Sequence, residues 1–287
     1  VKSVIAAKFI NLNLTSCLNF KYNLSAQNMP YLYHLTMLQP HINYQFKAPV
    51  WRLEIDALSE TIFVEIRHPD DKKVQFEAIS LETGNVLFEG LETEERWLTG
   101  IETSYDGVLL LHNYQSEAAP VHKGLTAVDL SGKIIWSNYT HAFDHLSANG
   151  PVIYDTRIQP RKLFVADIKT GATKRLYEPS IDIEPDNYIV LPDEILADII
   201  KQLPLTISPF GNTVHYLEYN NFRIVSLHTF AEGALQQQLY IINNNNDIIY
   251  QDLLNTGIQK LQPESFLMYK DHLIYLKDKS QLKVLNL

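Results

Sequence analysis

The stretch Leu125-Thr-Ala-Val-Asp-Leu-Ser-Gly-Lys-Ile-Ile-Trp136 consists of two short apolar runs on either side of a Ser-Gly turn. This pattern predicts a β-hairpin, because glycine reaches positive φ at little cost and lets the turn follow the twist of the strands. The same pattern, centred on Gly or Asn, recurs at Phe76–Phe88, Leu163–Gly171 and Leu239–Tyr250. Hairpins that recur every ~40–50 residues are typical of the blades of a β-propeller.

Around these hairpins the sequence predicts four antiparallel strands in each repeat, numbered from the central channel outward. The first repeat comprises Val50–Asp56, Thr61–His68, Val74–Leu81 and Asn85–Leu91, and the second Trp97–Thr103, Gly107–Tyr114, Gly124–Leu130 and Lys133–Asn138. The third runs from Phe143 to Glu178, and the fourth comprises Thr213–Tyr219, Phe222–Thr229, Gln238–Asn243 and Asp247–Leu253. The last repeat offers only Ser265–Lys270, His272–Lys277 and Gln281–Leu287.

The missing strand is expected at the other end of the chain. Residues His41–Lys47 alternate apolar and polar side chains, as a half-buried strand does. We expect this segment to pair with Leu282–Asn286 and close the ring, since unpaired edges invite aggregation. The sequence thus predicts an all-β propeller of about five four-stranded blades in one domain, residues 31–287. Six or seven blades are the alternative if an insertion hides further strands.

That insertion lies between the third and fourth repeats, at residues 185–204. Pro192-Asp-Glu suits a helix start, and Ile195, Leu196, Ile199, Ile200 and Leu203 share one helical face. The pattern predicts an amphipathic helix that covers apolar surface on a rim of the propeller. A helix that binds a partner is the alternative.

Composition excludes several classes of protein. The 287 residues are 46% hydrophobic and 20% charged, which is ordinary for a globular chain. A net charge of −9 gives no overall basic field, so we expect no nucleic-acid partner. No run of 18 or more apolar residues suggests a transmembrane segment. The single cysteine, Cys17, fits a reducing compartment, and we expect a cytoplasmic location.

The first 30 residues have two interpretations. Val4–Ala7 and Leu14–Cys17 resemble a lipoprotein signal that ends in a lipid-accepting cysteine, which would make the protein lipid-anchored through Cys17. Lys8, Asn11 and Asn13 interrupt the apolar region that such a signal requires. We therefore favour a poorly ordered extension, and the residues before Met29 could reflect the choice of start site.

Ala127–Trp136 resembles the repeat of quinoprotein-like propellers (PQQ-like and WD40-like), in which Ala-x-Asp, a Thr-Gly or Ser-Gly turn and a Trp recur. Ala166–Gly171 keeps the Asp and the turn but has no Trp at the matching point. The resemblance implies the fold. It does not imply quinone chemistry, because the adjacent cysteines and calcium-binding carboxylates of the quinone dehydrogenases are missing. The chain also resembles a small family of uncharacterised bacterial single-domain propellers, a likeness that implies no activity.

The best candidate ligand site lies at the starts of the first strands, which line the channel mouth of a propeller. These starts carry Trp51-Arg52, Arg96-Trp97 and Asp144-His145. An indole beside a guanidinium can stack on a sugar or aromatic ligand and bind its carboxylate bidentately. The alternative is that Trp51 and Trp97 fill space between blades while the arginines pair with nearby acids.

Three histidines, His68, His112 and His228, fall near the ends of second strands. They could form an arc of metal ligands or proton donors. The ends of second strands in different blades lie far apart, however, so we interpret these histidines as solvated rim residues. No metal and no cofactor are assigned from the sequence.

Familiar catalytic signatures are missing, among them Gly-x-Ser-x-Gly, His-Glu-x-x-His and paired-cysteine zinc motifs. We therefore favour a non-catalytic binding or scaffold propeller, whose partner is an unknown protein or small-molecule ligand bound at the rim and channel mouth. An enzyme that acts there on a small polar or carbohydrate-like ligand, with His145 or His112 as acid–base, is one alternative. A lipoprotein in envelope assembly, dependent on acylation of Cys17, is another.

Overall fold

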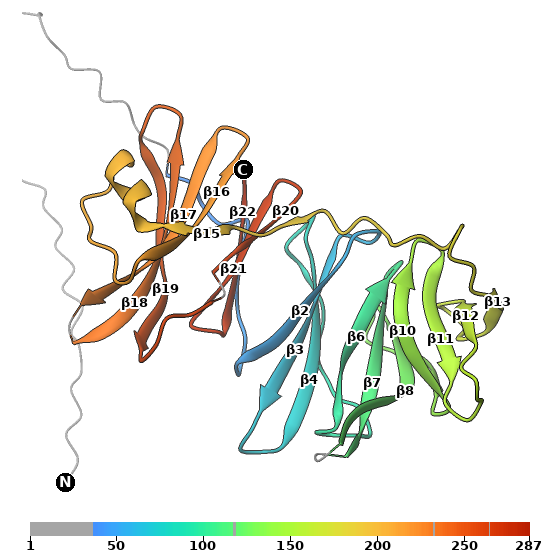
Figure 1. Cartoon of the computed structure of the whole chain (residues 1–287). Coiled ribbons are helices and arrows are strands. Elements are labelled where there is room, and N and C mark those ends of the chain that lie inside the picture. The colour runs from blue at the N-terminus through green and yellow to red at the C-terminus, as the bar shows by residue number, and fades with distance from the viewer. Residues whose placement is uncertain (1–36, 117–118, 232, 264) are drawn as a thin grey trace, which may run out of the picture. The chain divides into compact units, whose positions relative to one another are not determined.

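Strands make up nearly all of the regular structure in the computed structural model, which describes residues 37–116, 119–231, 233–263 and 265–287. They form five antiparallel sheets of four or five strands (Figure 1). The expected N-terminal extension, residues 1–30, and Cys17 lie outside the described residues. No helix in the described ranges is both long and apolar enough for a membrane crossing.

Four of the sheets are meanders in which consecutive strands pair, as the recurring hairpins predict, and three of these have four strands each. The first sheet contains β2 (Val50–Asp56), β3 (Thr61–His68), β4 (Lys73–Ser80) and β5 (Val86–Leu91). The second contains β6 (Thr99–Tyr105), β7 (Val108–Ser116), β8 (Ala119–Asp129) and β9 (Ile134–Asn138). The third contains β10 (His141–Ser147), β11 (Gly150–Asp155), β12 (Leu163–Ala166) and β13 (Thr173–Leu176).

The other two sheets have five strands each. The fourth contains β15 (Asp193–Leu196), β16 (Thr213–Tyr219), β17 (Phe222–Ala231), β18 (Ala234–Asn243) and β19 (Ile248–Ile258). The fifth is ordered β1 (Ile42–Gln45), β22 (Gln281–Asn286), β21 (His272–Lys277), β20 (Leu267–Tyr269) and β14 (Ile189–Val190). The predicted pairing of the N-terminal strand is confirmed, since Ile42 lies opposite Val284 and Tyr44 opposite Leu282.

The predicted amphipathic helix of the insertion is only partly correct, because the helix is shorter than expected. Its first turn is instead strand β15, in which Ile195 lies opposite Val214 of β16. A 3-10 helix, η1 (Ala197–Gln202), follows. Ile200 and Leu203 are buried against the fourth sheet, so the apolar residues still cover apolar surface. Pairing with β16 also satisfies backbone groups of an edge strand, which a helix would leave exposed.

The central strands are buried on both faces, which explains their continuous apolar runs. In β3, Ile62 and Val64 pack in a cluster with the fifth sheet, whereas Phe63 packs in a cluster with the second. In β7, Leu109 faces the first sheet and Leu110 faces the third. A further cluster joins the fourth sheet to the fifth. Apolar clusters thus join the sheets in the order fourth, fifth, first, second, third.

A glycine contact recurs between successive sheets. In each case the glycine at the outer turn of one sheet lies on a side chain from the outer strand of the preceding sheet. The three pairs are Gly84 with Ile42, Gly132 with Phe88, and Gly171 with Trp136. The contact is tightest at Gly171, where an added Cβ would lie 2.8 Å from Cδ2 of Trp136. Glycine is therefore needed here for close approach as well as for its φ of +71°.

An aspartate organises the same outer turns. Oδ1 of Asp129 accepts hydrogen bonds from the backbone N–H groups of Ser131 and Lys133, at 2.9 and 3.0 Å. Oδ1 of Asp167 likewise accepts from Lys169 and Thr170. These Asx-type bonds give the backbone a local partner that favours the turn. The recurring Ala-x-Asp and Gly thus stabilise the turns at which neighbouring sheets pack closely.

A charged network links the fourth and fifth sheets at Asp252 of β19. Its carboxylate lies 2.8 Å from Nζ of Lys277 and 2.6 Å from Nζ of Lys283. The hydroxyl of Tyr275 donates to Oδ2 at 2.7 Å. Burial raises the pKa of Asp252, but the two ammonium groups and the hydroxyl outweigh it and lower the pKa to about 2.

We expect Gly171→Ala to destabilise the fold by about 2–4 kcal/mol, because backbone strain and the contact with Trp136 add together. Gly257→Ala is the matched control, since Gly257 has a φ of +61° but no atom within 4 Å of an added Cβ. It should lose only about 1 kcal/mol. Urea unfolding measures both variants. Equal losses would contradict a packing role for Gly171.

We expect Asp252→Asn to lower the free energy of unfolding at neutral pH by about 1–2 kcal/mol, a figure discounted for partial solvent screening. A carboxyl with a lowered folded pKa stabilises the fold above its ordinary pKa of 3.8, and this stabilisation is lost as the pH falls toward 2. The difference between variant and wild type should therefore shrink in acid. Asp71→Asn, at an exposed position, is the control. A pH-independent difference would contradict the charge-based explanation.

Candidate functional site

The first strand of each of the first three sheets contains a β-bulge. Register shifts between Val50 and Arg52, between Ile101 and Thr103, and between Phe143 and His145 leave one residue of each strand without a partner. The three unpaired residues are Trp51, Glu102 and Asp144. Bulges change the direction of side chains and are frequent beside functional sites, so these three positions indicate where a site could lie.

Trp51 and Trp97 are brought together by an arginine that the sequence analysis did not single out. The guanidinium of Arg67 in β3 lies over both rings, 5.2 Å from the centroid of Trp51 and 5.0 Å from that of Trp97. Arg67 is held by Glu65, 2.6 Å away, and donates to the carbonyl of Thr99. The indole of Trp51 is 69% exposed. This tryptophan–arginine stack (Trp51, Arg67, Trp97) is therefore a rigid aromatic surface with an open side.

Arg52 connects the first and second sheets beside the stack. Its guanidinium donates to the carbonyls of Ile101 and Glu102, at 2.9 and 3.0 Å, and to Oε2 of Glu54. These bonds hold the bulge of β2 against that of β6. They use three of the five N–H donors of the Arg52 guanidinium, whose side chain is 40% exposed. Arg96 is exposed just before Trp97.

Glu102, His112 and His122 form the most unusual polar group in the described part of the chain, here termed the His–Glu cluster. Oε2 of Glu102 lies 3.1 Å from Nδ1 of His112 and 2.9 Å from Nδ1 of His122. The two imidazole rings are stacked with centroids 3.5 Å apart. Burial raises the pKa of Glu102, but the neighbouring imidazoles outweigh it and hold the pKa below its ordinary value. Glu102 is thus an ionised carboxylate between two imidazoles.

A close backbone approach at Gly100 makes room for the cluster. A Cβ added at Gly100 would lie 3.2 Å from Nε2 of His112 and 3.2 Å from Oε2 of Glu65. That same Glu65 oxygen accepts the N–H of Ile101 at 2.9 Å, beside the bulge. Glycine at this position lets the buried carboxylate and the imidazole approach the same stretch of backbone.

Asp144 and His145 belong to a separate group on the third sheet. Nδ1 of His145 lies 2.8 Å from Oδ2 of Asp144, whose Oδ1 accepts from Arg161 at 3.1 Å. The guanidinium of Arg161 lies over the ring of Tyr154, and His145 meets the ring of Tyr177 edge-on. The pair lies in the middle of β10, and no hydrogen bond, ion pair or ring contact among the described residues joins it to the tryptophan–arginine stack.

The interpretation of the three histidines as solvated rim residues is wrong for two of them. His112 is 3% exposed and His228 is 5% exposed. The reason is that β7 continues to Ser116 and β17 to Ala231, so both histidines lie within their strands. Nε2 of His228 accepts from the N–H of Gln262 at 3.0 Å. His68 is half-buried and its Nε2 lies 2.8 Å from Oε1 of Gln75.

A pocket of about 490 Å³ lies at the C-terminal ends of β2, β6 and β10. Ile55, Tyr105 and Leu146 line it, and the segment 185–189 crosses it on the way to β14. Of its acids, Asp56 already accepts from the N–H of Gly107 at 2.6 Å. The pocket is largely apolar, which favours a structural role over chemistry.

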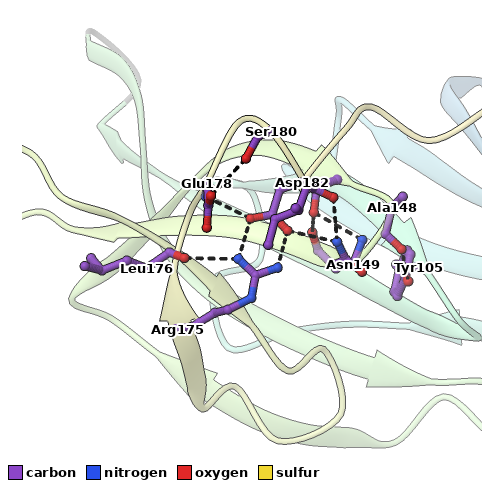
Figure 2. Close-up of polar contacts among 11 residues, drawn as sticks. Tyr105, Ala148, Asn149, Arg175, Leu176, Glu178, Ser180 and Asp182 are labelled. Atoms are coloured by element: carbon purple, nitrogen blue, oxygen red, sulfur yellow. Dashed lines mark hydrogen bonds and ion pairs between the residues drawn. The ribbon is translucent and has the colours of Figure 1, made fainter.

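The loop after β13 is fixed by a buried carboxylate, shown in Figure 2. Both terminal nitrogens of Arg175 bind the carboxylate of Asp182, which also accepts from the N–H of Glu178 and from Nδ2 of Asn149. A bidentate arginine with further donors satisfies the carboxylate fully. The pKa of Asp182 is accordingly far below its usual range, chiefly because of Arg175. We regard this network as structural.

Sequence reasoning missed Arg67, Glu102 and His122. The expected third strand of the second repeat began at Gly124, whereas β8 begins at Ala119. Extending the β7–β8 hairpin through this stretch would have placed His122 opposite Tyr114, close to His112. The β-branched Val121 was the available signal that the strand begins before Gly124. No comparable signal marks the bulge that turns Glu102 toward the histidines.

Residues 55–136 match the model of a domain of unknown function (DUF4905). The matched segment runs from β2 to β9 and includes Arg67, Trp97 and the whole His–Glu cluster. It covers less than half of the chain. The comparison with curated proteins finds no match.

Solved structures show weak similarity over most of the chain. A member of the DUF4221 family from Bacteroides vulgatus is 8% identical, covers 88% of this chain and 98% of that chain, and gives a TM-score of 0.31. A glycosyl hydrolase from Bacteroides ovatus is 8% identical, with coverage of 89% and 92% and a TM-score of 0.29. An uncharacterized protein from Listeria monocytogenes is 10% identical, with coverage of 82% and 94% and a TM-score of 0.32. Scores of this size identify neither a fold nor an activity.

Proposed function

We propose that the five sheets are the blades of a β-propeller, and that the protein is a non-catalytic binding module for a small ligand with a sugar-like or aromatic face. The exposed indole of Trp51, supported from behind by Arg67, carries this proposal. Aromatic faces bind flat apolar surfaces of ligands, and cation–π support keeps the ring in place.

Three further features support a binding role. Trp51 is the bulge residue of β2, where side chains are re-aimed away from the regular ladder. The arginine of the stack is locked by Glu65 and backbone carbonyls, so the surface is preorganised and little conformational entropy is lost on binding. The apolar pocket at the opposite strand ends offers no comparable set of polar groups among the residues that line it.

A thermal-shift screen of the full chain against sugars, nucleosides and aromatic acids tests the proposal. At about a hundredfold excess over Kd a ligand stabilises the folded state by about 2.7 kcal/mol, which is roughly a 5 °C rise in Tm. Trp51→Ala should abolish this rise because it removes the stacking surface.

Phe230→Ala is the matched control, since Phe230 is an aromatic residue that is 62% exposed on the fourth sheet. It should retain the ligand-dependent rise. A rise that survives in Trp51→Ala would place the ligand elsewhere. The lack of any rise across the panel would overturn small-ligand binding in favour of a protein-binding scaffold.

An enzyme that acts on a small polar or carbohydrate-like ligand is the second candidate. It is favoured by the Glu102–His122 pair, in which a 40% exposed imidazole lies 2.9 Å from a carboxylate. His112 is too deeply buried for the acid–base role that the sequence suggested, whereas His145 is 36% exposed. Product analysis after incubation with any ligand that raises Tm separates the two functions. Turnover that is lost in His122→Ala would establish the enzyme and overturn the non-catalytic proposal.

A further inference from the structure

The His–Glu cluster lies within one sheet, on three adjacent strands. Glu102 is the bulge residue of β6, His112 lies in β7 and His122 in β8. All three strands are tied into the ladder on either side of these residues, so the side chains start from fixed backbone positions. Such placement gathers the donor atoms and does not depend on a loop.

The donor atoms have the spacing of a metal site. One ligand atom from each of the three residues lies within 4.8 Å of the others. Zinc binds nitrogen at about 2.0–2.1 Å and carboxylate oxygen at about 2.0–2.2 Å, which puts neighbouring ligand atoms roughly 3.3 Å apart. The separations of 3.1 and 2.9 Å between Glu102 and the two imidazoles are within a few tenths of an ångström of this value.

His112 supplies an independent observation that points to a ligand. It is 3% exposed, and no described residue makes a well-aligned hydrogen bond with either of its ring nitrogens. Its Nδ1 points toward Glu102 at 3.1 Å without that alignment. Buried polar groups nearly always have partners, and leaving one unpaired costs about 1–3 kcal/mol. A cation bound beside Glu102 would give this imidazole a well-aligned partner.

We propose that Glu102, His112 and His122 bind a divalent transition metal of the zinc class. Two imidazoles and one carboxylate suit zinc and its neighbours, whereas calcium and magnesium prefer all-oxygen sites. The carboxylate offsets part of the charge of the ion. Tyr114 lies edge-on to both imidazoles at 4.7 and 5.2 Å. Because the two rings are stacked, binding of one ion by both requires the half-exposed ring of His122 to turn out of the stack. The side chain of His122 is 40% exposed, so the fourth coordination position opens to solvent.

This site is independent of ligand binding at Trp51, and its test measures the metal directly. Metal-free protein is titrated with Zn²⁺ by calorimetry, and with Co²⁺ by absorbance. We expect one ion per chain and visible bands typical of low-coordinate Co²⁺. Mg²⁺ and Ca²⁺ should not compete.

His122→Ala and Glu102→Gln should each weaken Zn²⁺ binding by more than about tenfold, since even outer partners of metal ligands are worth about 10–100-fold. His122 is half-exposed, so its loss should leave the fold intact, and the Tm of the metal-free variants verifies this. His145→Ala removes a comparable imidazole–carboxylate pair outside the cluster, and Cys17→Ser removes the one thiol. Both should bind as the wild type does.

Two outcomes would overturn the proposal outright, and a third would place the site elsewhere. One is a wild-type chain that takes up no Zn²⁺. The other is a folded His122→Ala variant that binds Zn²⁺ as tightly as His145→Ala. Loss of binding in Cys17→Ser with retention in Glu102→Gln would likewise move the site away from the cluster. Failure of ligand binding at Trp51 leaves each of these outcomes unchanged.

Discussion

The burial of each central strand on both faces is the constraint on which the structure depends. Because β3 packs against the fifth sheet with Ile62 and against the second with Phe63, no sheet can bury its apolar surface alone. Neighbouring sheets must approach closely along their whole width. At the outer edge this approach requires glycine, and Gly171 lies directly on Trp136. The first strands of the first and second sheets are bulged, and these bulges position Trp51 and Glu102.

Much of the fold could be predicted because its signals are local. An apolar run, an Asp or Asn, a glycine and a second apolar run determine a hairpin within about a dozen residues. The β1 pairing with β22 was also predictable, since an alternating strand at one end matched a missing strand at the other. The conformation of the insertion could not be predicted in the same way. Ile195 and Ile200 have helical spacing, but the open edge of β16 competes for the same backbone and forms β15 with it. Local propensity yields there to tertiary contact.

The candidate site was predictable only in part. Trp51 and Asp144 stand at equivalent positions in their repeats, and aligning the repeats identified both. The stack between Trp51 and Trp97 depends on Arg67, which looked like an ordinary polar residue at the end of a strand. A bulge leaves only a weak mark in a single sequence, because it shifts the alternation by one residue and β6 has few apolar side chains that would show the shift. The sequence therefore did not single out Glu102, and His112 was interpreted without its two neighbours, Glu102 and His122.

The fifth sheet is assembled from three distant parts of the chain, and this has a consequence for synthesis. Residues such as Gln45 and Ser280, which contact each other there, lie 235 positions apart. Closing so long a loop carries a large entropic penalty and slows folding. Each of the first three sheets is built from consecutive strands and can therefore form during translation. Until β20–β22 have been synthesised, the face of β3 that carries Ile62, Val64 and Ile66 is not covered by the fifth sheet. The nascent chain is therefore most vulnerable to aggregation at the first sheet, β2–β5.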